Sequence, residues 1–208
     1  MSYTRPQTPK EAWTALLEGN QHFITGNPSH PRQDIDRREN VAEVQRPFAA
    51  LFGCSDSRLS AEIIFDVGLG DLFVVRNAGQ VIAETILGSL EYAVEVLGVP
   101  LIMVLGHDEC GAIRATIDST KGSLQAKGEF IQHIVASIQP TVRAANAQGI
   151  HEIDEVTSLH VQDTINDLVS RSRIIREAID AGKLAIVGAN YKLVLGDIHP
   201  LVMVGQVS

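Results

Sequence analysis

The sequence predicts an α/β fold: a mainly parallel central β-sheet flanked by helices, with an N-terminal helical arm and an antiparallel edge strand. Short apolar runs occur without polar alternation, which is typical of strands buried on both faces. Amphipathic helical patterns lie between these runs, and such alternation favours a parallel sheet. The chain has 208 residues, 45% of them hydrophobic, and no linker-like segment divides it, so we expect a single domain over residues 1–208.

The first expected element is a helix over residues 9–25, within an N-terminal arm that covers residues 1–46. Thr8 and Glu11 have the spacing of a capping box, and Pro9 occupies the first helical position. Because a polar segment follows this helix, we predict that its apolar stripe packs on a second subunit. The stripe consists of Ala12, Trp13, Leu16, Leu17, Phe23 and Ile24.

Four apolar runs are the expected strands of the parallel sheet, and they cover residues 48–53, 72–75, 100–106 and 184–188. Helical periodicity between them predicts helices at residues 83–97, 129–145 and 156–181. The last apolar segment, residues 201–207, follows a Gly-Asp pair. We expect this segment to return antiparallel along one edge of the sheet.

The charge of the chain excludes several classes of partner. Its formal net charge is -8 and its pI is about 5.3, and it has no cluster of Lys and Arg, so nucleic acid and anionic membranes are not expected partners. No apolar run reaches the roughly 18 residues of a membrane span. The polar N-terminus lacks the pattern of a signal peptide, which predicts a cytoplasmic protein. Thiols stay reduced there, so two cysteines indicate a metal site or catalysis more than a disulfide.

Candidate metal ligands follow two of the predicted strands. Cys54 comes directly after the run that ends at residue 53, and His107 comes directly after the run that ends at residue 106. Parallel neighbours would bring both side chains to one edge of the sheet, whereas an antiparallel pairing would leave them roughly 17–20 Å apart. Cys110 lies three residues after His107, close enough to face the same point. These residues predict a zinc site with Cys54, His107 and Cys110 as ligands.

Charged residues close to the predicted ligands suggest catalysis. Asp56 lies two residues after Cys54, where it can be a fourth metal ligand or contact a bound water, and Arg58 can hold Asp56 by a bidentate ion pair. Gly111 allows the backbone to approach the site, where a backbone N–H can donate to a developing oxyanion. Other interpretations stay open: a Cys54–Cys110 disulfide, a thiol redox protein, or a structural zinc site closed by Asp56.

The spacings Cys54-x-Asp56-x-Arg58 and His107-x-x-Cys110 resemble the paired signature of the β-class carbonic anhydrases. The resemblance covers most of the chain and is densest at residues 53–58, 72–79, 88–94 and 104–111. It implies a zinc lyase that hydrates carbon dioxide to bicarbonate and a proton, and that forms a homodimer or homotetramer. A hydrolase of a related molecule such as carbon disulfide is an alternative within the same fold.

The resemblance also implies roles for individual residues. Cys54, His107 and Cys110 correspond to the permanent zinc ligands, and Asp56 with Arg58 corresponds to the catalytic dyad. Four further residues fall at positions that bind substrate or line its pocket in plant-like members, partly from the partner subunit: Gln45, Phe73, Ala78 and Tyr92. A bacterial subgroup has a regulatory bicarbonate site with a Trp three residues before the first Cys. Leu51 stands there in this chain, which puts such regulation in doubt although the companion Arg76 is present.

The predicted ligands also carry an expectation about pH. Two thiolates and a neutral histidine leave a zinc site formally neutral, so its water is acidified less and activity should favour alkaline pH. Asp56 can either bind the metal or pair with Arg58. Some members of the family are known to switch between these states, and we expect the closed one, with Asp56 on the metal, at lower pH.

Overall fold

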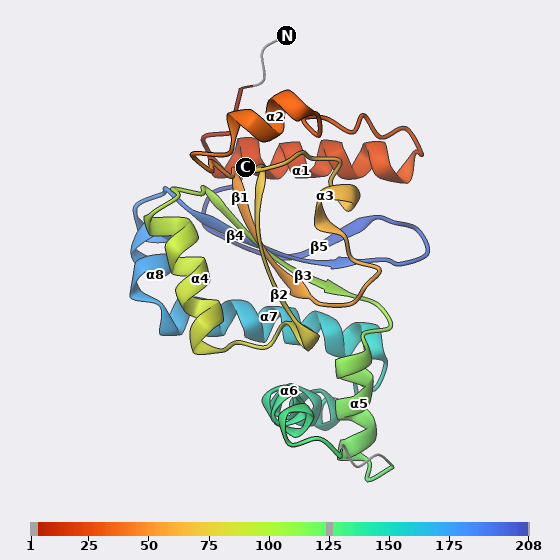
Figure 1. The fold of residues 1–208 in the computed structure, drawn as a ribbon. Coiled ribbons are helices and arrows are strands. Elements are labelled where there is room, and N and C mark those ends of the chain that lie inside the picture. The colour runs from red at the N-terminus through yellow and green to blue at the C-terminus, as the bar shows by residue number, and fades with distance from the viewer. Residues whose placement is uncertain (1–3, 124–126, 208) are drawn as a thin grey trace.

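The computed structural model describes residues 4–123 and 127–207, which contain a five-stranded sheet in the order β2-β1-β3-β4-β5 (Figure 1). The strands are β1 (Ala49–Cys54), β2 (Leu72–Asn77), β3 (Leu101–His107), β4 (Ala185–Tyr191) and β5 (Ile198–Val204). The first four strands are parallel, and β5 runs antiparallel to β4 at the edge. The predicted fold class is confirmed.

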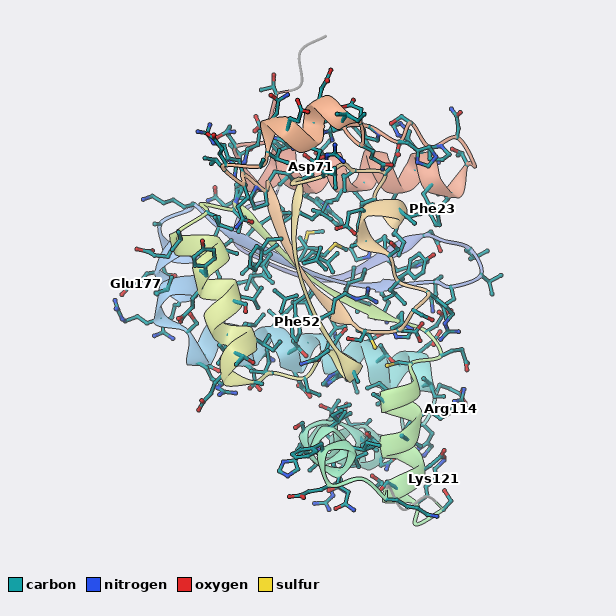
Figure 2. The ribbon with its side chains drawn as sticks, in the orientation of Figure 1. Phe23, Phe52, Asp71, Arg114, Lys121 and Glu177 are labelled. Carbon is teal, nitrogen blue, oxygen red and sulfur yellow. The ribbon has the colours of Figure 1, made fainter. Side chains whose placement is uncertain are left out.

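Helices cover both faces of this sheet. The helices of the described residues are α1 (Pro9–Ile24), α2 (Ile35–Asn40), α3 (Ala61–Ile64), α4 (Glu84–Glu95), α5 (Gly111–Thr120), α6 (Glu129–Ala147), α7 (Ile153–Arg171) and α8 (Arg173–Asp180), with a 3₁₀ turn η1 (Ala78–Gln80). One buried cluster joins α1 and α3 to the first face, and a second joins α4, α7 and α8 to the other. Figure 2 shows Phe52 of β1 on the side of the sheet that faces α4 and α7. Within the described residues, we find no helix that combines the length and the apolar character needed to cross a membrane.

Some boundaries differ from those predicted. The segment expected as one helix over residues 156–181 is two helices, because Ser172 interrupts it and its hydroxyl accepts a hydrogen bond from the backbone N–H of Ile175. The last strand begins at Ile198 rather than at residue 201. The short helices α2, α3 and α5 were not predicted, since each has too few turns to give a clear apolar period.

The predicted packing of α1 on a second subunit is wrong for its central residues. The capping box of Thr8 and Glu11 is present, but Trp13 and Leu16 are buried in a cluster with strands of the same chain. At Gly19 the helix passes so close to α3 that a Cβ atom would lie 1.8 Å from the carbonyl oxygen of Phe65. The central residues of the stripe therefore cover the core of their own chain, as amphipathic helices of globular proteins usually do, whereas Leu17 and Ile24 are exposed.

Gly19→Ala tests this packing. Alanine favours a helix over glycine by about 1 kcal/mol, but here its methyl group must displace the backbone of Phe65, and overpacking typically costs 1–3 kcal/mol. We expect the urea midpoint of unfolding to fall at constant protein concentration. The control is Gly88→Ala in α4, where a Cβ atom meets nothing within 4 Å and the midpoint should stay or rise. Equal midpoints for both variants would show that α1 does not lie on α3.

Candidate metal centre

Three potential metal ligands meet at the carboxyl ends of β1 and β3. Gly53 pairs with Leu105 in the parallel register, so Cys54 and His107 end neighbouring strands, and Cys110 precedes the first residue of α5. The ligand atoms of Cys54, His107 and Cys110 all lie within 4.8 Å of one another, and all three residues are buried. Among the described residues, this is the only such group of three. The predicted convergence of these side chains is therefore observed.

The donor set fits zinc. His107 Nδ1 lies 2.7 Å from the carbonyl oxygen of Asp108, and because a carbonyl only accepts, Nδ1 carries the proton. Nε2 thus presents its lone pair, and it is buried without a hydrogen-bond partner. In a tetrahedral site with zinc–sulfur bonds of 2.3 Å, two sulfur atoms lie about 3.8 Å apart, which agrees with the observed clustering. The three side chains therefore offer two sulfur ligands and one nitrogen ligand to one ion.

The two cysteines are electrostatically coupled. Cys54 and Cys110 are both free thiols, which does not support the interpretation that they form a disulfide. The predicted cytoplasmic location of the protein stays a prediction. A hydrogen bond from Cys110 lowers the pKa of Cys54, assisted by the backbone N–H of Gly79, and these effects outweigh burial. The Cys54 thiolate and burial in turn raise the pKa of Cys110. These opposite shifts favour one thiolate at Cys54 and one thiol at Cys110, and a cation bound between them would hold both sulfurs as thiolates.

Asp56 and Arg58 form the predicted ion pair at the rim of the site. Arg58 Nε donates to Asp56 Oδ1 at 2.9 Å and Nη2 donates to Oδ2 at 2.7 Å. The Arg58 guanidinium holds the pKa of Asp56 well below its usual range. Asp56 Oδ2 lies 4.0 Å from His107 Nε2. The carboxylate, which Arg58 binds, therefore borders the group formed by Cys54, His107 and Cys110, called here the metal group. Its role as a fourth ligand stays a prediction.

Arg76 supports the ligand loop in a way that the sequence did not reveal. It stands on β2, and its Nε donates to the carbonyl oxygen of Cys54 at 2.7 Å while Nη2 donates to that of Asp56 at 2.6 Å. The sequence associates Arg76 only with a regulatory site. The parallel pairing of β2 with β1, which places Arg76 opposite Gly53, is the signal that would have indicated this contact.

The residues expected to line a substrate pocket lie in two places, some beside the metal group and some away from it. Ala78 follows β2 beside the metal group, and Gly111 begins α5 directly after Cys110. Gln45 is exposed and precedes β1, so the strand separates it from Cys54 by roughly 20 Å at 3.3 Å per residue. Phe73 and Tyr92 pack together with ring centroids 6.1 Å apart. Phe73 lies at the opposite end of β2 from Ala78, away from the metal group of the same chain.

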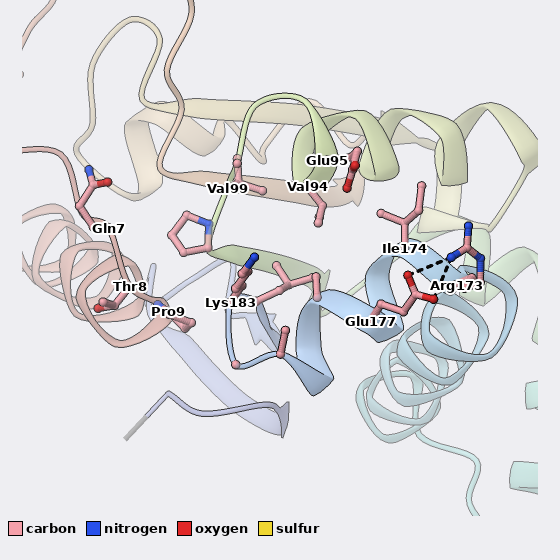
Figure 3. A pocket seen from close by; sticks show the side chains of 16 residues that line it. Gln7, Thr8, Pro9, Val94, Glu95, Val99, Arg173, Ile174, Glu177 and Lys183 are labelled. Carbon is pink, nitrogen blue, oxygen red and sulfur yellow. Dashed lines mark hydrogen bonds and ion pairs between the residues drawn. The ribbon is translucent and has the colours of Figure 1, made fainter.

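A groove of about 780 Å³ lies elsewhere, at the amino ends of β3 and β4, where Pro100 and Leu184 lead into the sheet (Figure 3). Two of its charged residues, Arg173 and Glu177, bind each other, with Nη1 2.8 Å from Oε1. Ligands of open α/β sheets bind beyond the carboxyl ends of the strands, and the metal group lies at that end of this sheet. The groove therefore does not compete with the metal group as the candidate functional site.

Comparison with known proteins agrees with this site. Residues 49–198 match the family described as carbonic anhydrase. Carbonic anhydrase 2 of Mycobacterium tuberculosis is 50% identical over 186 residues, which cover 89% of each chain. The structure of the β-carbonic anhydrase CcaA is 26% identical with a TM-score of 0.73, and the match covers 93% of this chain and 99% of that one. A tetrameric β-carbonic anhydrase of Sordaria macrospora is 22% identical with a TM-score of 0.73, over 93% of this chain and 98% of that one. The chain belongs to the β-class carbonic anhydrase family.

Proposed function

We propose that this protein binds zinc through Cys54, His107 and Cys110 and catalyses the reversible hydration of carbon dioxide to bicarbonate and a proton. The observation that carries the proposal is the convergence of two buried thiols and one correctly oriented imidazole at the carboxyl ends of two parallel strands. Three protein ligands leave a fourth position open, as in catalytic zinc sites. Membership in the carbonic anhydrase family supports this reaction.

Zinc at this site would lower the pKa of a water molecule and supply a nucleophile near neutral pH. The protein then has to orient the reactants. Asp56, held by Arg58, would accept a hydrogen bond from the attacking water and so aim its lone pair at the carbon. The N–H of Gly111, the first residue of α5, has no partner within the helix and could donate to the oxygen that gains charge, whereas the N–H groups of Ala112 and Ile113 bond the Cys110 sulfur.

The conformation of Asp56 favours catalysis over a purely structural zinc site. A closed structural site needs Asp56 as the fourth ligand, whereas here both carboxylate oxygens accept hydrogen bonds from Arg58. We propose that Asp56 turns from Arg58 toward the metal as the pH falls, which would close the site. The low pKa of Asp56 keeps it ionised, so competition for the metal and not protonation of the carboxylate would drive this change.

We also propose that the protein is a homodimer or homotetramer. Gln45, Phe73 and Tyr92 lie away from the metal group of their own chain, so they can line its substrate pocket only if a second copy contributes them. Phe73 belongs to β2, which lies at the edge of the sheet. The outer edge of β2 pairs with no other described strand, so a second copy can approach it there. The tetrameric relative from Sordaria macrospora shows that this fold permits the assembly.

Replacement of each ligand tests the metal site. The purified protein should carry about one zinc per chain, the expectation for a single three-residue site. Cys54→Ala, His107→Ala and Cys110→Ala should each lose the zinc and the hydration activity, measured by metal analysis and stopped-flow assay. His133→Ala, which changes an exposed histidine of α6, should retain both. Zinc retained at full occupancy by all three ligand variants would falsify the site.

Arg58→Ala tests the orienting pair. Loss of the guanidinium frees Asp56 to approach the metal, and loss of such a supporting partner typically lowers activity about 10- to 100-fold. We expect zinc content to stay unchanged and the remaining activity to appear only at higher pH. The matched control is Arg173→Ala, which breaks the exposed pair with Glu177 far from the site. An unaltered pH profile in Arg58→Ala would contradict the role of this pair.

Sedimentation equilibrium tests the assembly. At micromolar concentration the mass should equal two or four times the 22.5 kDa of one chain. Gln45→Ala should then lower the hydration activity without altering the mass, since its side chain would act in the partner's pocket. A monomeric protein with full activity would overturn the proposal that a second copy completes the site.

A further inference from the structure

His160 is a buried histidine that the proposed reaction does not use. It lies on α7 and is only 6% exposed. Its Nε2 lies 2.8 Å from the carbonyl oxygen of Gly79, and because the carbonyl can only accept, Nε2 carries the proton and donates. Burial lowers the pKa of His160, which agrees with a neutral ring. The side chain is therefore a fixed hydrogen-bond donor to one backbone carbonyl.

That carbonyl belongs to the residue that contacts a metal ligand. The backbone N–H of Gly79 donates to Cys54 Sγ at 3.4 Å. Gly79 has φ 74°, which favours glycine, and a Cβ atom there would lie 2.7 Å from that of Ala112 and 2.9 Å from Ile138 Cδ1. Gly79 is thus confined on the side that faces α5 and α6. Its backbone N–H bonds Cys54, and its carbonyl oxygen bonds His160.

We infer that His160 is a positioning residue for the Cys54 thiolate and acts through Gly79. By holding the carbonyl of Gly79, it keeps the adjacent N–H directed at the sulfur. Hydrogen bonds to a ligand sulfur withdraw electron density and tune the metal. Two thiolates would neutralise the charge of zinc, so a weaker sulfur donor leaves more positive charge to acidify water. This inference rests on Cys54 being a metal ligand, as proposed above.

The other ring nitrogen of His160, Nδ1, is buried and has no hydrogen-bond partner among the described residues. His160 lines a pocket of about 450 Å³ between α6 and α7, together with Asp163 and Asp167. Asp163 Oδ2 accepts a hydrogen bond from Thr141 at 2.5 Å. Within the part of the chain that the structure describes, these residues do not form a group of three converging metal ligands. The donor bond to Gly79 is the feature that connects this histidine to the candidate site.

Cobalt-substituted protein provides a direct readout, because thiolate-to-cobalt charge-transfer absorption reports on the sulfur. His160→Leu removes the donor but retains the bulk, and we expect its band to move to longer wavelength. Loss of cobalt to a chelator should accelerate about 10- to 100-fold, the usual effect of losing a supporting partner of a ligand. His160→Gln places an amide N–H near the position of Nε2 and should restore both properties toward the wild type.

A buried substitution on the same helix separates this role from a packing effect. The Thr164 hydroxyl donates to the carbonyl oxygen of His160 at 2.7 Å, one helical turn away from the His160 side chain, so Thr164→Val should leave the band in place. If His160→Leu fails to fold, His160→Asn, whose amide is too short to reach Gly79, takes its place. If the band of the folded His160→Leu or His160→Asn variant lies at the wild-type wavelength, the proposed role of His160 is overturned. A wild type without the band overturns the metal site itself, and this inference with it.

Discussion

The parallel pairing of β1 with β3 is the constraint on which the candidate site depends. It brings the carboxyl ends of two central strands to the same edge, so that Cys54 and His107 lie side by side while their strands are buried in the core. An antiparallel pairing would separate them by the length of a strand. β2 extends the same arrangement outward, and the turn after it delivers the Gly79 N–H to Cys54 Sγ. Three neighbouring strand ends therefore build one site.

Hydrogen bonds to backbone carbonyls hold the candidate ligands in place. Arg76 fixes the carbonyls of Cys54 and Asp56, and the carbonyl of Asp108 sets the tautomer of His107. Each contact determines where a ligand atom points without contributing a ligand of its own. Such supporting contacts reduce the reorganisation that metal binding requires and tune the ligands. In this chain they come from β2 and from the loop after β3, which are next to the ligands in space.

The sequence predicted the fold class and the three converging ligands because both depend on local patterns: unbroken apolar runs and residues at their ends. It did not predict where α1 packs, since an apolar stripe shows that a face is buried but not against which surface. The break at Ser172 was missed because it carries neither Gly nor Pro. The contacts of Arg76 and Gly79 with the ligand loop join residues that are twenty or more positions apart in sequence, so no local spacing indicates them.

The central claim is that a metal joins the ends of β1 and β3 through two thiolates and one imidazole. X-ray absorption at the zinc edge of the purified protein measures these ligands directly. The account predicts two sulfur atoms near 2.3 Å, one nitrogen at about 2.0–2.1 Å, and a fourth light atom at a similar distance. A coordination shell without sulfur, or with a single sulfur, would contradict it, because Cys54 and Cys110 would then not hold the same ion.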